Sequence, residues 1–121
     1  MFGSIEKCHN VKDFRKLAKR KLPSPIFHYI DGGSDDEVTL KRNTESFNKC
    51  DLVPNVLTDV SNIDLSTTVL GQKISFPLFL ASTAMHRLYH HHGETATGKA
   101  AEKMGTIFGT STMATTSIEE I

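Results

Sequence analysis

The stretch that decides the fold is Phe76–His86, which reads FPLFLASTAMH. Its apolar run from Pro77 to Ala81 ends abruptly in small polar residues, and a helix-type sequence follows. This pattern is typical of a parallel strand that is buried on both faces, and functional groups collect in the loop where such a strand ends. We therefore predict a buried strand over Pro77–Ala81. The small residues Ser82–Ala84 would then let a flat ligand approach the backbone.

A strand, helix, strand pattern continues from this point to residue 121. Gly93 and Glu94 open a helix that Gly105 closes, and Thr106–Ser111 forms a second short strand. Ser117–Glu120 has the spacing of a capping box and announces another helix. Two parallel strands alone would leave a sheet edge and apolar faces uncovered. We therefore expect an α/β fold of which this sequence is an incomplete part.

The sequence before Phe76 predicts helices and then an irregular excursion. One helix starts at Asn10 and stops at Pro23, with Val11, Phe14, Leu17 and Ala18 on one face. A second helix starts at Ser24-Pro25 and ends at Gly32-Gly33, where we expect a residue in the left-handed conformation. A third helix covers about 35–48, and its expected buried positions are Val38, Leu40 and Phe47. Residues 51–75 predict an excursion with a hairpin that turns at Gly71-Gln72.

Composition bounds the class of protein. The chain has 121 residues, which is enough for at most one domain. Its 14 basic and 14 acidic side chains balance, so the net charge does not favour binding to nucleic acid. Residues 12–21 are locally basic, and we interpret them as a solvated helix face rather than a phosphate or membrane contact. Cys8 and Cys50 form no metal or disulfide pattern, and no apolar run approaches the roughly 20 residues of a membrane span. A protein that is soluble, or at most peripheral to a membrane, is expected.

Few side chains point to chemistry by themselves. His86 and His90–His92 have no carboxylate or cysteine cluster beside them, so no metal site is predicted. Tyr29 can be a core residue that needs a hydrogen-bond partner, or it can reach over the strand ends and donate to an anion. Glycine-rich phosphate loops and a nucleophilic serine motif are both missing from the sequence.

Taken together, the motifs resemble the FMN-dependent 2-hydroxy acid dehydrogenases and oxidases, a family that includes L-lactate dehydrogenases, glycolate oxidases and mandelate dehydrogenases. The resemblance covers nearly the whole chain, and its segments occur in the family's order: Lys21–Pro23, Phe27–Glu37, Thr39–Asn43, Asp59–Ser61, Ser66–Gly71, Ala81–Met85, Gly93–Glu94 and Ser117–Glu120. Among the subgroups, the bacterial L-lactate dehydrogenases look most similar. The resemblance implies the N-terminal part of a (β/α)8 barrel, with helices and an excursion over about 1–75 and the first strand-helix-strand unit over about 76–121.

The resemblance also implies roles for individual residues. The loop matching Ser82, Thr83 and Ala84 presents backbone groups to the flavin ring of FMN, and a serine matching Ser111 binds the pyrimidine side of that ring. The tyrosine matching Tyr29 holds the substrate carboxylate, while Met113 lines the substrate pocket. No catalytic residue is expected within the chain, because the family's base histidine and its arginine clamp lie downstream; none of the six histidines matches the base.

One departure is Ser82, where the family usually has proline; serine restores a backbone N–H and loosens the loop. The predicted function is the oxidation of an L-2-hydroxy acid by hydride transfer to FMN, and L-lactate is the expected substrate. A longer protein is expected to carry out this reaction, and these residues alone are expected to be inactive. That longer protein is expected to be a homo-oligomer in the cytoplasm, and peripheral attachment to the inner membrane is also compatible with the sequence. Three alternatives are also compatible with the sequence. The chain could be a truncated, non-catalytic paralogue that serves as an assembly module, the product of a broken gene, or a small nucleic-acid binder.

Overall fold

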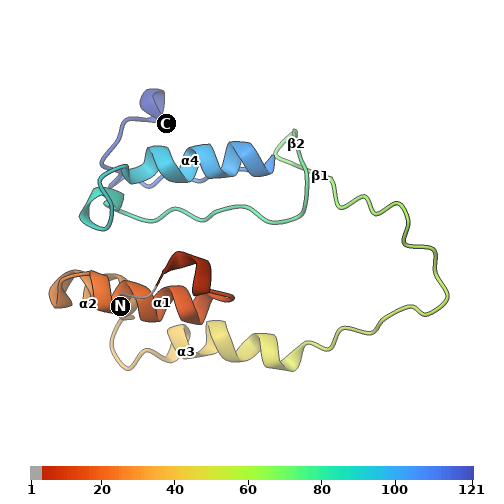
Figure 1. The fold of residues 1–121 in the computed structure, drawn as a ribbon, viewed down its shortest axis with the longest axis horizontal. Helices are drawn as coiled ribbons and strands as arrows, with labels where there is room; N and C mark the ends of the chain where they lie inside the picture. Colours follow the sequence, from red (N-terminus) through yellow and green to blue (C-terminus); the bar gives the residue numbers. More distant parts are fainter. Residues whose placement is uncertain (1–3) are drawn as a thin grey trace. The chain divides into compact units, whose positions relative to one another are not determined.

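The computed structural model describes residues 4–121, which fall into two compact units, one up to Val56 and one from Leu57 to Ile121 (Figure 1). The first unit is helical. A 3-10 turn, η1 (Ile5–Lys7), precedes α1 (Val11–Lys21), α2 (Ser24–Asp31), α3 (Val38–Glu45) and a second 3-10 turn, η2 (Ser46–Lys49). The second unit holds a hairpin, β1 (Thr67–Val69) and β2 (Gln72–Ile74), the turn η3 (His86–Leu88), helix α4 (Gly93–Met104) and the turn η4 (Ile118–Glu120).

The start of α1 confirms the predicted cap. The Asn10 side chain accepts a hydrogen bond from the Asp13 amide at 3.0 Å, which satisfies one of the free N–H groups of the first turn. Of the predicted apolar face, Leu17 is buried while Val11 and Phe14 are exposed. Leu17 and Phe27, the latter from α2, are the buried apolar side chains of this unit. The core of the first unit is therefore small.

The two glycines after α2 have a different role from the predicted one. Gly32 has φ −83°, and neither Gly32 nor Gly33 adopts a positive φ. A Cβ on Gly32 would lie 3.0 Å from the His28 carbonyl oxygen, and a Cβ on Gly33 would lie 3.1 Å from Leu40 Cβ. The expectation of a left-handed residue was wrong: these positions favour glycine because neighbouring atoms come close.

Helix α3 is shorter than predicted. It begins at Val38 because Asp35 and Glu37 adopt left-handed φ values of 49° and 58°, which a helix does not tolerate. The prediction that Val38, Leu40 and Phe47 are buried was also wrong, since all three are exposed. Gly33 approaches Leu40, but α3 has no buried residue.

The hairpin confirms the expected excursion, with its turn one residue earlier than predicted. Strands β1 and β2 pair antiparallel with Thr67 opposite Ile74 and Val69 opposite Gln72, so Leu70 and Gly71 form the turn. Their φ values of 51° and 81° are both positive, as in a type I′ hairpin turn. Ile74 is buried and forms the core of the second unit together with Ala101 of α4.

Helix α4 has the bounds that the sequence predicts. It begins at Gly93 and ends at Gly105, whose φ of 63° provides the expected left-handed cap. Of its predicted small-residue face, Ala101 is buried, while Ala96, Ala100 and Met104 are exposed. The Ser75 amide donates to the Gly105 carbonyl at 2.8 Å, so the segment after β2 runs alongside α4 from this end (Figure 1).

The two predicted parallel strands are reduced to one bridge. Leu80 and Phe108 pair in parallel, with the Leu80 amide donating to Ile107 O at 3.0 Å and the Gly109 amide donating to Leu80 O at 2.9 Å. The parallel direction was predicted correctly, but the strands Pro77–Ala81 and Thr106–Ser111 were not: a ladder of two short segments without further neighbours does not extend. The predicted capping box also fails, since the Ser117 side chain caps nothing and a 3-10 turn follows it.

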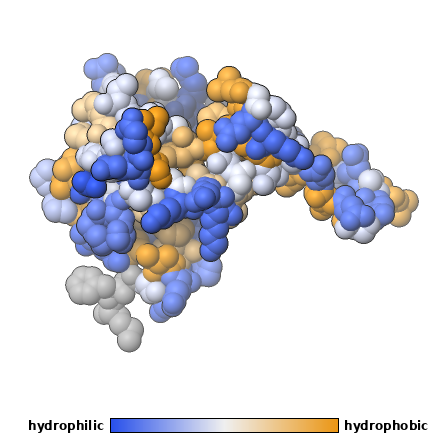
Figure 2. Space-filling view, turned by 90° about the horizontal axis from the view of Figure 1, so that it is seen from above, coloured by the Kyte–Doolittle hydropathy of each residue, from blue (hydrophilic) through white to orange (hydrophobic). Residues whose placement is uncertain are grey.

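Apolar side chains lie on the surface between η2 and β1. Residues 50–66, all inside the described part of the chain, form neither helix nor strand, and Asp59 and Asp64 close local turns by accepting from the amides of Ser61 and Ser66. The large apolar residues of this segment are all exposed: Leu52, Val53, Val56, Leu57, Val60, Ile63 and Leu65. Orange patches in Figure 2 show exposed apolar residues. Within residues 4–121, no helix has the length and apolar character that crossing a bilayer requires.

Candidate functional site

Two loops of the second unit meet where the two bridged segments end. The first loop comprises residues 82–92 and the second loop residues 111–117. The Met85 amide donates to Met113 O at 3.0 Å, and the Arg87 amide donates to Thr115 Oγ1 at 3.3 Å. Parallel pairing directs both chain ends to the same edge, and these bonds then join the loops. The structure therefore brings the predicted segment Ser82–Ala84 onto one edge with Ser111 and Met113.

The first loop presents free hydrogen-bond donors. Among the contacts of residues 4–121, the amides of Ser82, Thr83 and Ala84 donate to no acceptor. Ser82 is exposed, and Thr83 and Ala84 are half-buried. Consecutive unpaired amides at a strand end can bind the acceptor atoms of a ligand.

The second loop supplies a hydroxyl group and a thioether. Ser111 is half-buried, and its Oγ accepts from the Met113 amide at 3.1 Å, while its carbonyl accepts from the Ala114 amide at 3.0 Å. Since the hydroxyl is used here as an acceptor, its own hydrogen is left to donate. The Met113 side chain is 55% exposed, so it can contact a ligand at this edge.

Tyr29 lies in the other unit, on α2, and is 58% exposed. Of the two interpretations of this tyrosine, burial in the core of the first unit is wrong. An ion pair fixes α2 against α1: Arg15 Nε and Asp31 Oδ1 are 2.5 Å apart, and the second oxygen accepts from Nη2 at 2.8 Å. This hydrogen bond raises the pKa of the Arg15 guanidinium and lowers the pKa of the Asp31 carboxyl. The bidentate pair holds the helix that carries Tyr29.

Glu94 is the best-connected side chain at this edge, and the sequence assigned it no role. It is fully buried, and its two carboxylate oxygens accept four hydrogen bonds. Oε1 accepts from the amides of His86 at 3.1 Å and Thr115 at 2.9 Å, and Oε2 accepts from the hydroxyls of Thr115 at 2.6 Å and Thr116 at 3.0 Å. One acid at the start of α4 thus binds both loops.

These contacts decide the charge of Glu94. Burial on its own raises the pKa of a carboxyl group, but the hydrogen bonds from Thr115, from the helix start and from His86 outweigh it and hold the pKa of Glu94 far below its ordinary value of 4.5. Glu94 is therefore ionised at neutral pH. No local sequence pattern marks this role, because Thr115 and Thr116 lie 21 and 22 residues after Glu94.

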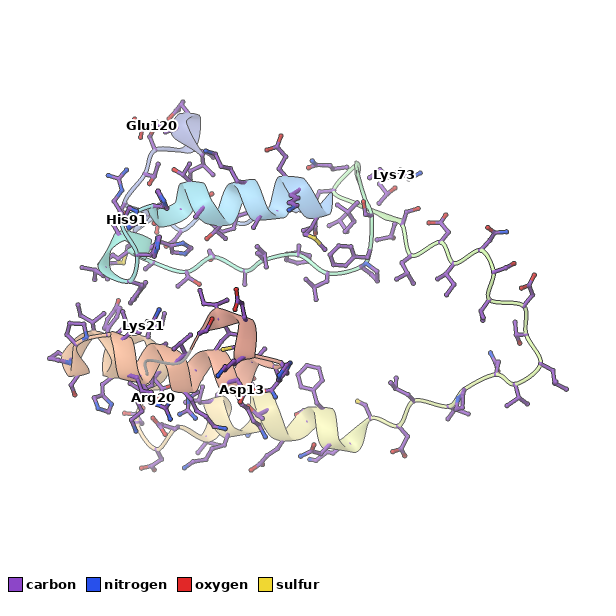
Figure 3. All side chains as sticks on the ribbon, viewed as in Figure 1. Asp13, Arg20, Lys21, Lys73, His91 and Glu120 are labelled. Carbon is purple, nitrogen blue, oxygen red and sulfur yellow. The ribbon has the colours of Figure 1, made fainter. Side chains whose placement is uncertain are left out.

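The histidines of the first loop are placed by different contacts. His86 Nδ1 lies 3.2 Å from Thr97 Oγ1, and its Nε2 is buried with no partner among the described residues. The rings of His90, His91 and His92 lie close together at tilted angles, with centroids 4.0–5.2 Å apart. Figure 3 shows His91 beside the start of α4. The neighbouring charge of His91, followed by a small loss of hydration and the charges of His90 and Lys99, lowers the pKa of the exposed His92. Within residues 4–121, no three His, Cys, Asp or Glu side chains come together as metal ligands.

Comparisons with known proteins identify the family to which the chain is similar. Residues 18–121 match the family model of the FMN-dependent dehydrogenases. The chain is 47% identical over 112 residues to glycolate oxidase 1 of Oryza sativa subsp. indica, covering 93% of this chain and 30% of that protein. It is also 47% identical over 117 residues to a peroxisomal (S)-2-hydroxyacid oxidase of Arabidopsis thaliana, covering 97% and 32%.

Solved structures show the same relation. A soluble mutant of the membrane-associated (S)-mandelate dehydrogenase of Pseudomonas putida matches with a TM-score of 0.85 and 38% identity, covering 92% of this chain and 32% of that one. A monotopic membrane (S)-mandelate dehydrogenase matches with a TM-score of 0.87 and 36% identity, covering 94% and 31%. The chain spans about a third of the length of the proteins it matches. It belongs to the FMN-dependent dehydrogenase family.

Proposed function

We propose that this chain contributes the flavin-facing and part of the substrate-facing surface of an enzyme that oxidises a small L-2-hydroxy acid to the 2-oxo acid, with L-lactate as the expected substrate. The observation that carries the proposal is the pair of joined loops. They place the unpaired amides of residues 82–84 on the same edge as the Ser111 hydroxyl. The family is FMN-dependent, and its matched relatives include glycolate and mandelate enzymes.

The residues present at this edge fit a flavin. A flavin ring offers nitrogen and carbonyl acceptors along its edges, and the first loop offers amide donors that no described residue uses. Backbone donors fix such a ring without a bulky side chain in its way, and Ala84 keeps the approach open. The Ser111 hydrogen is a further donor, assigned to the pyrimidine side. We propose that Ser82, Thr83, Ala84 and Ser111 hold the ring.

FMN, when bound, accepts the hydride that leaves the substrate carbon. Tyr29 is proposed to donate its phenol hydrogen to the substrate carboxylate, a bond that orients the acid. Met113 is proposed to line the pocket and so to limit substrate size, because a thioether side chain adapts to small differences in shape. The proton acceptor and the arginine clamp are assigned to parts of the enzyme outside these residues.

The 121 residues alone are expected to bind FMN weakly or not at all and to have no activity. A (β/α)8 barrel needs about 250 residues, and the chain spans 30–32% of its matched relatives. We propose that the longer enzyme is a cytoplasmic homo-oligomer. The matched relatives differ in location, because one is a monotopic membrane protein and another is peroxisomal. Cell fractionation with and without high salt therefore tests whether the longer enzyme is attached peripherally to the inner membrane.

The first experiment titrates FMN into the purified chain while flavin fluorescence and thermal unfolding are followed together. A parallel sample is a chimera, the graft, in which this chain replaces the matching segment of the rice glycolate oxidase 1. Binding by the graft and little or none by the chain is expected. Absence of binding in a folded graft would overturn the proposed function. Co-purification of the chain with a full-length relative, without FMN, would instead favour an assembly module.

The second experiment measures turnover of the graft with L-lactate, glycolate and (S)-mandelate and an artificial electron acceptor. Relative to the unmodified rice enzyme, the graft is expected to have a higher ratio of kcat/KM for L-lactate to kcat/KM for glycolate, and a shift toward mandelate would contradict the small-substrate proposal. Ser111→Ala is expected to weaken FMN binding about tenfold, the value of one hydrogen bond to a ligand. The matched control is Ser117→Ala, because the Ser117 side chain is exposed and caps no helix.

A further inference from the structure

We propose that Glu94 is a positioning residue for the flavin: its carboxylate sets the spacing of the first and second loops, and thereby of the amides of residues 82–84 relative to Ser111. This inference rests on the proposed function. Glu94 touches neither the flavin nor the substrate in this proposal, and acts through the backbone of both loops.

The contacts of Glu94 are divided between the two loops it joins. Its oxygen Oε1 accepts one amide from each loop, His86 N at 3.1 Å and Thr115 N at 2.9 Å. Ala84 lies two positions before His86 along the first loop, and Ser111 lies four positions before Thr115 in the second. A movement of either amide away from Oε1 would therefore shift the residues assigned to the flavin.

Helix α4 makes this grip rigid. Glu94 and Thr97 lie one turn apart, and both hold His86, through its amide and through Nδ1 at 3.2 Å. Gly93 adopts φ 54°, and a Cβ there would lie 2.8 Å from Arg87 Cγ and 3.4 Å from Thr116 Oγ1. The absence of a side chain at Gly93 thus lets the first turn of α4 approach both loops closely.

Chemistry explains why an acid occupies the position. Four donors converge on one side chain, and an ionised carboxylate is the side chain that accepts from all of them and donates to none. Glutamine keeps the oxygen that accepts both amides, and its NH2 group can donate to hydroxyls that rotate. Alanine leaves both amides without a partner. Glutamine is therefore the conservative variant and alanine the disruptive one.

The test compares Glu94→Ala, Glu94→Gln and the control Glu102→Ala in the graft. Glu102 lies on the same helix and is exposed, so its loss should change FMN binding less than twofold. Glu94→Ala is expected to raise the Kd for FMN at least tenfold and to shift the flavin absorption spectrum, while Glu94→Gln restores the Kd to within about threefold of the unmutated graft. If Glu94→Ala does not fold, Glu94→Asp, whose carboxylate is one methylene group further from the two amides, is expected to raise the Kd at least threefold.

A folded Glu94→Ala graft, or a folded Glu94→Asp graft where alanine fails, with an unchanged Kd and spectrum would overturn the inference. Failure of the proposed function looks different, because the unmutated graft would then bind no FMN. In that case hydrogen exchange still tests the grip: the amides of His86 and Thr115 should lose protection in Glu94→Ala and keep it in Glu94→Gln. Equal protection in all three proteins would show that Glu94 does not hold the loops.

Discussion

Helices α3 and α4 show how differently two helices of one chain are specified. Helix α4 has buried residues in its first turn and near its end, a glycine cap at Gly105, and Glu94 bound to two loops. Helix α3 has eight residues, no side-chain cap and no buried residue. Isolated helices of this length are marginal in water. The difference teaches that α4 is held by interactions within these residues, whereas α3 receives little support from them.

The largest change in unfolding free energy that tests this difference between α3 and α4 is expected at Gly93. Gly93→Ala places a Cβ 2.8 Å from Arg87 Cγ at a φ of 54°, so the graft should lose about 1–3 kcal/mol of unfolding free energy, measured in urea. Lys99→Ala on the same helix is the control: Lys99 is exposed, its φ is not positive, and the substitution only removes atoms. Equal losses in both variants would mean that the start of α4 is no more constrained than its middle.

An intermediate effect is expected from acid. The pKa of Glu94 is lower in the folded than in the unfolded state, so its stabilising effect is complete above the ordinary value of 4.5 and is lost as the pH falls below it. The unfolding free energy of the graft should then decrease by up to about 1.4 kcal/mol per pH unit more than that of the Glu94→Gln graft. Urea unfolding at pH 6, 4.5 and 3.5 measures this. Parallel curves for the two proteins would contradict the assigned charge.

The smallest effect is expected beside α3. Phe47 is 80% exposed, so Phe47→Ser in the 121-residue chain should change the unfolding free energy by less than about 0.5 kcal/mol. Thermal unfolding of the chain, with Phe27→Ser as the buried control, measures the difference. A loss at Phe47 as large as the loss at Phe27 would show that the Phe47 side chain, which follows α3 in η2, is covered after all.

Local signals explain which elements could be predicted from the sequence. The Asn10 cap, the stop at Pro23 and the glycine after Met104 act within a few residues, and the structure has α1 and α4 where these signals put them. The strand Pro77–Ala81 was overpredicted because an extended ladder depends on neighbouring strands, and Leu80 pairs only with Phe108 among the residues that the structure describes. Burial at Val38, Leu40 and Phe47 was inferred from a pattern, and a pattern does not say whether a partner surface is present.

The candidate site likewise contains residues that could be predicted from the sequence and one that could not. Strand-end position and resemblance pointed to Ser82–Ala84, Ser111 and Met113, whose loops the structure joins through the Met85–Met113 bond. Their roles toward FMN, like that of Tyr29, stay predictions. Glu94 was missed because its partners are 8, 21 and 22 residues away in sequence, and hydrogen bonds over such distances leave no local pattern.

The hairpin turn has a consequence for engineering. Leu70 is fully exposed and has a φ of 51°, a conformation that costs a branched side chain about 1–2 kcal/mol and suits asparagine or glycine far better. The strand that follows this turn leads into Ser75, which anchors the far end of α4 at Gly105. Replacing Leu70 would therefore strengthen the anchor of α4 from the end opposite Glu94. Stability could be raised there without altering a residue assigned to flavin or substrate.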